Sequence, residues 1–257
     1  MPVSMIATTT FVAAGSVSEP DLAALGEAVA RLHAAAATAT DPRHGHPDTV
    51  RRITLDNFAE LRRLPECEPA TSAMDALELR LACELDRLRS LMLERQAAGR
   101  VRECHGDLHC GNVVRWQGRL VPFDGIEFDE ALRFIDMVND IAFLTMDLAE
   151  RGRGDLRRAA LQAWCETLGD FAGLPVLPYY ECYRSLVRAK VAALAALQAT
   201  ADSARRAAAV ADCLRYLDWA GARLAQRRPA LLLTCGLSGS GKTWLARQVA
   251  PALGALH

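Results

Sequence analysis

Apolar residues recur at every third or fourth position through most of this chain, a spacing that places them on one face of an α-helix. In the first such segment the repeat runs through Leu22, Leu25, Val29 and Leu32. Glycine and proline residues separate the segments, so the pattern predicts a mainly helical fold built from several helices. The predicted helices cover residues 21–37, 54–64, 72–99, 141–150, 155–168, 179–200 and 204–223.

Capping signals mark where two of these helices begin. Ser18 is followed by a proline and, three positions on, by an aspartate that can close a capping box. Ser72 has an aspartate at the same spacing, just ahead of the longest apolar repeat. Gly99 follows that repeat, at a place where a left-handed residue often ends a helix. We therefore expect a long helix that leads directly into residues 102–140.

A change of pattern after the long helix predicts a pair of short β-strands. Residues 113–116 and 119–123 are rich in β-prone side chains and are joined by a Gln-Gly pair, a two-residue connection typical of a hairpin. If the residues flanking that turn pair with each other, counting back places Asn112 opposite Phe123 and next to Asp124. A carboxamide and a carboxylate then meet at the open end of the hairpin.

Polar residues are concentrated between positions 102 and 140, and several are spaced as in a phosphoryl-transfer site. Asp107 lies five positions before Asn112, and Asp124-Gly125 follows the hairpin. Two carboxylates and a carboxamide suit a hard cation such as Mg²⁺ that bridges phosphate oxygens. Their order and spacing are those of the kinase catalytic and metal-binding loops. The alternative interpretation makes the aspartates a turn residue and a hairpin terminus, because Asp-Gly is common in turns.

The stretch HGDLHCGN and the segments FDGIEF, LRFIDMVNDIAFLTMDL and YRSLVRAKV that follow it resemble the aminoglycoside and choline phosphotransferases, which share the kinase fold. The order of these segments is similar to that in one bacterial subfamily, in which an aminoglycoside phosphotransferase family enzyme is fused to a P-loop ATP-binding domain. The resemblance implies that Asp107 orients and deprotonates an acceptor hydroxyl, while Asn112 and Asp124 hold Mg²⁺. It also implies that His105 is a backbone anchor in the catalytic site and that Asp140 is a structural carboxylate bracing the loop.

Arg184 and Arg188 lie four residues apart, so they share one face of the predicted helix at 179–200, with Lys190 turned partly away. A solvated basic stripe is the simpler interpretation. Because the resemblance includes the YRSLVRAK segment, contact of the two arginines with a phosphate or an acidic substrate is the alternative.

Histidine and cysteine residues raise zinc binding as another alternative. Cys104, His105, His109 and Cys110 lie close together in the sequence, but they lack the paired spacing of zinc modules. The two histidines of the polar loop TDPRHGHPD are interpreted as surface residues, and His33 as a packed or capping histidine.

A second motif lies near the end of the chain. Residues 236–243, GLSGSGKT, fit the P-loop pattern G-x-x-x-x-G-K-T, with a predicted strand at 230–235 before it and an amphipathic helix after it. The glycines let backbone N–H groups surround phosphates, the lysine reaches the outer phosphates, and the threonine offers a hydroxyl to Mg²⁺. The candidate nucleotide-binding residues are Gly236, Ser238, Gly239, Ser240, Gly241, Lys242 and Thr243.

The ATP-binding features of a kinase small lobe are missing from the sequence. The chain has only two lysines, Lys190 and Lys242, and no G-x-G motif precedes Asp107. We therefore expect a segment of a longer protein. Its fold class is mainly α (α+β), with residues 1–226 forming the large lobe of a kinase-like phosphotransferase without its small lobe. Residues 227–257 are the truncated start of a P-loop NTPase domain.

The composition is that of a globular chain, and it narrows the choice of partners. Of 257 residues, 51% are hydrophobic and 24% charged, and 30 basic against 31 acidic residues give a net charge of −1. That balance favours neither nucleic acid nor a membrane as a partner, and no apolar run approaches the length of a spanning helix. Eight scattered cysteines and a start without Lys or Arg indicate reduced thiols in a cytoplasmic protein.

Together these features predict a phosphotransferase that uses ATP and Mg²⁺ and acts on a hydroxyl of a small molecule. Its predicted partners are that small molecule and the nucleotide, and the P-loop adds a second nucleotide-binding domain. The alternative is a catalytically inactive fragment or a non-catalytic nucleotide-binding module, because the lysine and the glycine-rich cover that hold phosphates in kinases are missing.

Overall fold

A computed structural model describes residues 16–199, 203–225 and 231–257, and most of them are helical. The α-helices are α2 (Glu19–Ala35), α3 (Pro47–Leu61), α4 (Thr71–Ala97), α5 (Glu130–Arg133), α6 (Met137–Glu150), α7 (Gly154–Leu168), α8 (Leu177–Gln198), α9 (Ser203–Leu224) and α10 (Lys242–Leu253). The 3₁₀ segments are η1 (Pro65–Ala70), η2 (Cys110–Asn112) and η3 (Phe171–Val176). The strands are β1 (Val101–Glu103), β2 (Val113–Trp116), β3 (Arg119–Pro122) and β4 (Phe134–Asp136).

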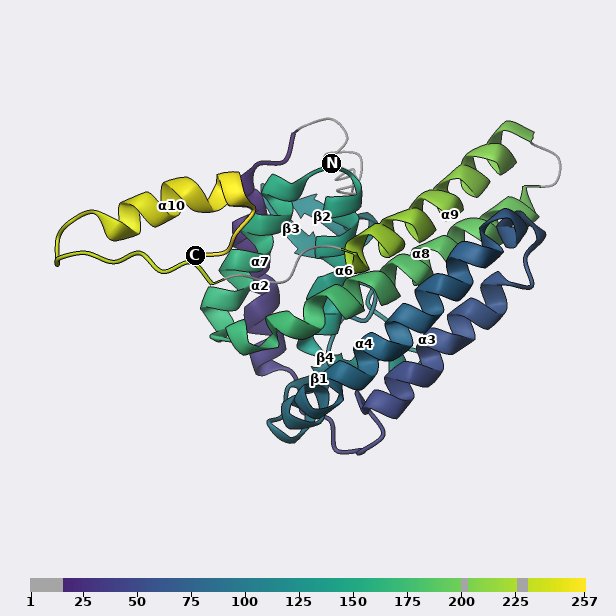
Figure 1. The fold of residues 1–257 in the computed structure, drawn as a ribbon, viewed down its shortest axis with the longest axis horizontal. Helices are drawn as coiled ribbons and strands as arrows, with labels where there is room; N and C mark the ends of the chain where they lie inside the picture. The colour runs from purple at the N-terminus through teal and green to yellow at the C-terminus, as the bar shows by residue number, and fades with distance from the viewer. Residues whose placement is uncertain (1–15, 200–202, 226–230) are drawn as a thin grey trace.

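The helices bury their apolar faces against one another around α8. Helix α8 packs along α9 and also contacts α6 and α3, while α2 packs along α7 (Figure 1). The largest buried side chains at these contacts are Phe58, Phe143, Trp164, Tyr179 and Tyr180. The prediction of a mainly helical fold is confirmed. No helix in the described ranges combines the length and apolar character that crossing a bilayer requires.

The start of α3 differs from the prediction. The helix begins at Pro47, seven residues before the predicted start at position 54. His46 caps it, because its Nδ1 accepts the N–H of Asp48 at 3.2 Å. Histidine is not among the usual capping residues. The sequence pattern therefore predicted that the first residues of α3 belong to a polar loop.

The start of α4 also differs, whereas its end is as predicted. The expected capping box at Ser72 does not form, since the helix begins at Thr71 directly from η1 and no side chain caps it. The hydroxyl and the N–H of Thr71 both donate to the carbonyl of Glu68. The preceding 3₁₀ turn therefore takes the place of a cap. Gly99 has φ +69° and ends the helix in the expected left-handed conformation.

The predicted hairpin is confirmed, including its register. Strands β2 and β3 are antiparallel, with Trp116 paired with Arg119 at the turn. Beyond the last pair, the N–H of Phe123 donates to the carbonyl of Asn112 at 3.0 Å. A second antiparallel pair, β1 with β4, connects the chain before the hairpin to the chain after it.

A buried ion cluster fixes the segment that leads into α6. Arg95 of α4 donates to both oxygens of Asp136 and both oxygens of Asp170, at 2.8 to 2.9 Å. Burial opposes the charge of Arg95, but the two carboxylates outweigh it and raise the pKa of the guanidinium. Asp136 also accepts the N–H of Val138 at the start of α6. The cluster thereby joins α4, β4 and η3 beneath the first turn of α6.

The segment before the P-loop does not have its predicted form. Residues 231–235 form no strand, while position 230 and the predicted boundary between 226 and 227 lie outside the described residues. Leu231, Leu232 and Leu233 are 85%, 67% and 79% exposed. A single strand needs neighbours for its hydrogen bonds and its apolar side chains, and the described part of the chain offers it none. The predicted helix does form, as α10, and extends away from the bundle (Figure 1).

Candidate functional site

The loop that follows β1 contains the candidate catalytic residues, and Gly106 shapes it. This glycine has φ +81°, and a Cβ added there would lie 2.8 Å from the carbonyl oxygen of Leu132. Its N–H donates to Oδ1 of Asp140 at 2.8 Å. Both its conformation and the close approach of α5 therefore require glycine at this position.

His105 attaches the loop to the hairpin through its imidazole ring. Nε2 lies 2.9 Å from the carbonyl oxygen of Phe123, and Nδ1 accepts the N–H of Asp107 at 3.3 Å. Because a carbonyl oxygen can only accept, the ring proton lies on Nε2. The carbonyl of His105 also accepts the N–H of Ile126. The predicted backbone anchor thus contacts main chain on both sides of the loop.

Asp140, on α6, is completely buried and accepts three N–H groups. Gly106 donates to Oδ1, while the His105 N–H and the His33 Nε2 donate to Oδ2 at 3.2 and 2.9 Å. Burial raises the pKa of Asp140, but His33, Arg184 and His105 outweigh it, so the pKa lies below its ordinary value. Asp140 therefore contacts the loop as an ionised carboxylate.

Trp164 fixes the tautomer of His33. Its indole N–H donates to His33 Nδ1 at 3.0 Å, so the ring proton of His33 lies on Nε2 and points to Asp140. The prediction of a packed histidine is confirmed. His33, Cys104 and Asp140 place ligand atoms within 4.8 Å of one another, but this Nε2 has no lone pair to offer. Burial also raises the pKa of the Cys104 thiol well above its usual value. The trio does not fit a metal ion.

Asp147, two turns after Asp140 on α6, holds the other end of the loop and was missed by the sequence analysis. It is completely buried, and its Oδ2 accepts the N–H of Cys110 at 3.0 Å. Arg151 and the hydroxyl of Tyr216 lie 3.2 and 3.5 Å from its Oδ1. The available signal was its seven-residue spacing from Asp140, which places both carboxylates on one face of the helix.

Arg184 braces the loop from α8, so the interpretation as a solvated stripe is wrong for this residue. It is 4% exposed, and Nη1 donates to the carbonyl of Gly106 at 2.9 Å. Its Nε donates to the carbonyl of Asn139 at 3.2 Å. Arg188 is half-buried, with its guanidinium carbon 5.7 Å from the centre of the Tyr216 ring. Neither arginine stands free in solvent.

Asp107 and Asn112 contact each other within this loop. The amide nitrogen of Asn112 donates to Oδ2 of Asp107 at 2.8 Å and to the carbonyl of the same residue at 3.0 Å. His109 Nε2 lies 3.5 Å from the same Oδ2. Burial raises the pKa of Asp107, but His109, Arg184 and Asn112 together leave it below the ordinary value. The side chain is 36% exposed, so an ionised carboxylate is accessible from solvent.

Asp124 lies directly after Phe123, at the open end of the hairpin, as the predicted register requires. Its φ of +61° is a left-handed conformation that few residues other than glycine adopt, and its side chain is exposed. Asn112 and Asp124 therefore offer a carboxamide oxygen and a carboxylate at this end of the hairpin. Such hard oxygen donors suit Mg²⁺, so the residues present fit that ion.

A comparison with models of protein families matches residues 10–184 to the phosphotransferase enzyme family. The matched stretch contains the loop, the hairpin and α6. The chain belongs to this family. Its members are kinase-type enzymes with a kinase-like fold, and membership implies the use of ATP, typically with Mg²⁺.

Relatives of this chain occur in mycobacteria. Proteins of Mycobacterium bovis and Mycobacterium tuberculosis, each named only as uncharacterized, are 31% identical to it over 247 residues. The match covers 96% of this chain and 48% of each relative, so the chain spans about half the length of these curated relatives.

Solved kinase structures show a weaker likeness. A glucosamine kinase has a TM-score of 0.48 at 19% identity, covering 87% of this chain and 60% of the kinase. An ethanolamine kinase of Plasmodium vivax has a TM-score of 0.45 at 11% identity, covering 84% of this chain and 62% of the kinase. At these scores neither structure informs the choice of substrate.

The loop after β1 does not have the features of a zinc site. Burial raises the pKa of the Cys110 thiol, as it does for Cys104, so both sulfurs remain protonated. His109 Nδ1 accepts the N–H of Gly111 at 2.9 Å, and both ring nitrogens of His105 contact main chain. Thiolates and free imidazole nitrogens, which zinc requires, are therefore not presented together.

The P-loop motif lies outside the residues that match the family. Gly236, Gly239 and Gly241 all have positive φ values, of 150°, 77° and 79°, and the loop is exposed. The ammonium of Lys242 donates to the carbonyls of Gly236 and Leu237, at 2.8 and 2.6 Å. The lysine therefore closes on its own loop, and these contacts must break before it can reach a phosphate.

Proposed function

We propose that this phosphotransferase transfers the γ-phosphoryl group of ATP to a hydroxyl of a small molecule in the cytoplasm. The observation that carries the proposal is the Asp107–Asn112 contact in a loop held by Asp140, Asp147 and Arg184. These side chains fix the loop at both ends, as catalysis by positioning requires.

Asp107 is the residue that orients the acceptor hydroxyl and receives its proton. As the acceptor oxygen bonds to the γ-phosphorus, the bond from that phosphorus to the ADP oxygen breaks, and the hydroxyl proton passes to the Asp107 carboxylate. A low pKa makes this carboxylate a weak base, so its main contribution is orientation in a loose transition state. Asn112 and Asp124 hold Mg²⁺, which when bound neutralises charge on the phosphate oxygens.

The P-loop provides a second nucleotide site in the longer protein. Residues 227–257 begin a P-loop domain there, in which Gly236, Ser238, Gly239, Ser240, Gly241, Lys242 and Thr243 surround a phosphate. Exposed leucines before the loop support this, because the strand expected there needs neighbouring strands to cover it.

Phosphoryl transfer in the longer protein that contains this chain tests the assignment. Labelled ATP is supplied with a panel of aminoglycosides, amino sugars, polyols and choline, and Asp107→Ala is compared with Asp56→Asn, which changes an exposed carboxylate on α3. We expect Asp107→Ala to lower turnover by a factor of roughly 10² to 10⁴, with the control unchanged. Undiminished transfer by folded Asp107→Ala protein contradicts the role given to this residue.

A non-catalytic nucleotide-binding module is the second candidate. It is favoured by the contacts of the two lysines in the sequence. Lys190 forms an ion pair with Glu60 (3.1 Å), and Lys242 donates to carbonyls of the P-loop. The sequence has no other lysine to hold the phosphates of ATP. Nucleotide binding without transfer to any acceptor, in the same assay, supports this candidate.

A further inference from the structure

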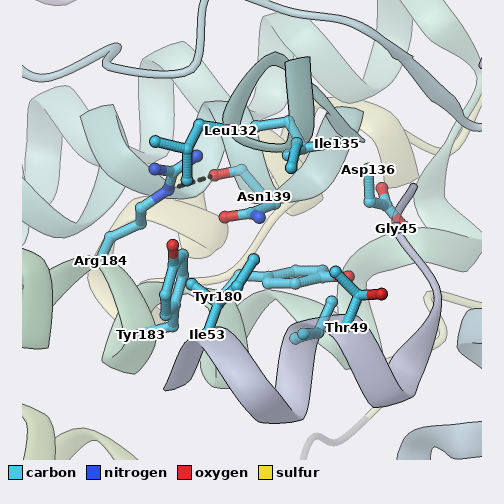
Figure 2. Close-up of a pocket in the computed structure, with 12 residues that line it drawn as sticks. Gly45, Thr49, Ile53, Leu132, Ile135, Asp136, Asn139, Tyr180, Tyr183 and Arg184 are labelled. Atoms are coloured by element: carbon cyan, nitrogen blue, oxygen red, sulfur yellow. Dashed lines mark hydrogen bonds between the residues drawn. The ribbon is translucent and has the colours of Figure 1, made fainter. Parts of the chain in front are cut away.

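A small pocket lies beneath the catalytic loop, between α3, α5, the start of α6 and α8. Figure 2 shows the side chains of Arg184, Asn139 and Tyr183 turned toward the same space, with Leu132 above them and Ile53 below. The cavity measures about 20 Å³, which is room for one water-sized group. Any larger part of a ligand therefore lies outside the cavity.

Two buried polar atoms of this pocket have no hydrogen-bond partner among the described residues. They are Nη2 of Arg184, a donor, and Oδ1 of Asn139, an acceptor. Arg184 and Asn139 are 4% and 5% exposed. The other guanidinium nitrogens of Arg184 donate to the carbonyls of Gly106 and Asn139. A buried polar group without a partner is costly, so the pair indicates a missing ligand group.

The chemistry of the two atoms selects that group. A carboxylate can accept from Arg184 but cannot donate to Asn139, and an ammonium can donate but cannot accept. A hydroxyl does both, since it accepts from Nη2 and donates to Oδ1. Tyr180 and Tyr183 supply ring surface, which suits the C–H groups of a carbon chain or sugar ring.

The pocket adjoins the proposed catalytic residue. Arg184 contacts the carbonyl of Gly106, the residue immediately before Asp107. Leu132, which lines the pocket, has its carbonyl within 2.8 Å of where a Cβ of Gly106 would lie. A ligand hydroxyl held between Arg184 and Asn139 therefore lies next to the loop segment that carries Asp107.

We propose that the acceptor is a polyhydroxylated compound, a sugar or polyol, anchored by a second, non-reacting hydroxyl between Arg184 Nη2 and Asn139 Oδ1. This inference rests on the proposed function, which it deepens by naming the substrate class. Asn139 and Arg184 are specificity-determining residues, and an acceptor with one hydroxyl, such as choline, gains nothing from the pocket.

Binding and transfer measured with matched ligands and variants test the proposal. D-glucose, its 2-, 3- and 6-deoxy analogues, myo-inositol and choline are titrated against the wild type, Asn139→Leu and Asn57→Leu. The last is a matched control, because Asn57 is another buried asparagine with an unpartnered side-chain nitrogen, and it does not line the pocket. Asn139→Leu should weaken polyol binding and raise the KM for polyols roughly tenfold, and it should leave choline unaffected. Asn57→Leu should leave the binding of polyols and of choline unchanged.

The outcomes separate this inference from the proposed function. Polyol binding that depends on Asn139 supports the pocket assignment, even if no phosphate is transferred and the proposed function fails. Asp107-dependent transfer to choline alone, with no polyol binding, overturns the pocket assignment and leaves the proposed function intact. Equal polyol affinity in the wild type and Asn139→Leu means that the pocket holds only water, which also overturns it. If one deoxyglucose fails to bind while the others bind, the hydroxyl that it lacks is the one anchored in the pocket.

Discussion

Replacement of Asp140 by asparagine tests whether the buried carboxylate holds the loop that contains the candidate catalytic residues. Three N–H groups converge on its two oxygens, from Gly106, His105 and His33. Asparagine has a single side-chain oxygen, so its NH₂ group must face at least one of these donors. Turning that oxygen toward His105 and His33 leaves Gly106 without an acceptor, and the opposite orientation leaves two donors unpaired.

The expected loss of stability follows from this count. One buried donor without an acceptor costs about 1 to 3 kcal/mol, and the remaining hydrogen bonds lose the strength that a charged acceptor gave them. Relief of the buried charge offsets part of the loss. We expect the free energy of unfolding to fall by about 3 kcal/mol, which in a chain of this size lowers the Tm by roughly 6 to 12 °C.

Urea denaturation of this chain, followed by circular dichroism, measures the effect. The matched control Asp56→Asn changes an exposed carboxylate and should shift the unfolding free energy by less than about 0.5 kcal/mol. The pKa of Asp140 is lowered in the folded protein, so its contribution is present above the unfolded pKa of about 3.9 and is lost as the pH falls through the folded pKa. A difference between wild type and Asp140→Asn that stays below 0.5 kcal/mol, or does not shrink in acid, refutes the reasoning.

Three further predictions concern other parts of the chain. Asp124→Gly should relieve the left-handed backbone and leave the unfolding free energy unchanged or up to about 1 kcal/mol higher in urea titrations, while phosphoryl transfer is lost; a clear destabilisation contradicts this. The Arg115 hydrogen bond lowers the pKa of Asp21 to about 2, so the stability difference between wild type and Asp21→Asn should be present above about pH 4 and shrink toward pH 2; a difference independent of pH counts against it. Cys83 and Cys235 are exposed and the other cysteines are buried, so a thiol reagent should label two cysteines in the native chain and eight after unfolding. Rapid labelling of more than two cysteines in the native chain would contradict the packing of the core.

Local interactions were largely determined by the sequence. The hairpin register follows from a two-residue turn, because Gln117 and Gly118 both have positive φ and Trp116 and Arg119 then have to pair. The same count placed Asn112 opposite Phe123. Helix periodicity predicted most helices because contacts between residues three or four apart decide which face is buried.

Only the tertiary structure decided how the loop is supported and what surrounds it. Arg184 lies 78 residues from Gly106, and its burial depends on how α8 packs on α6. Asp147 bonds the loop across 37 residues. Its spacing from Asp140 shows that the two carboxylates share a helix face, but not that this face is buried against the loop. The unpartnered Oδ1 of Asn139 depends on side chains brought together from α3, α5, β4, α6 and α8. Burial is a property of the assembled helices, so a sequence pattern can place these residues on a face but cannot show what covers that face.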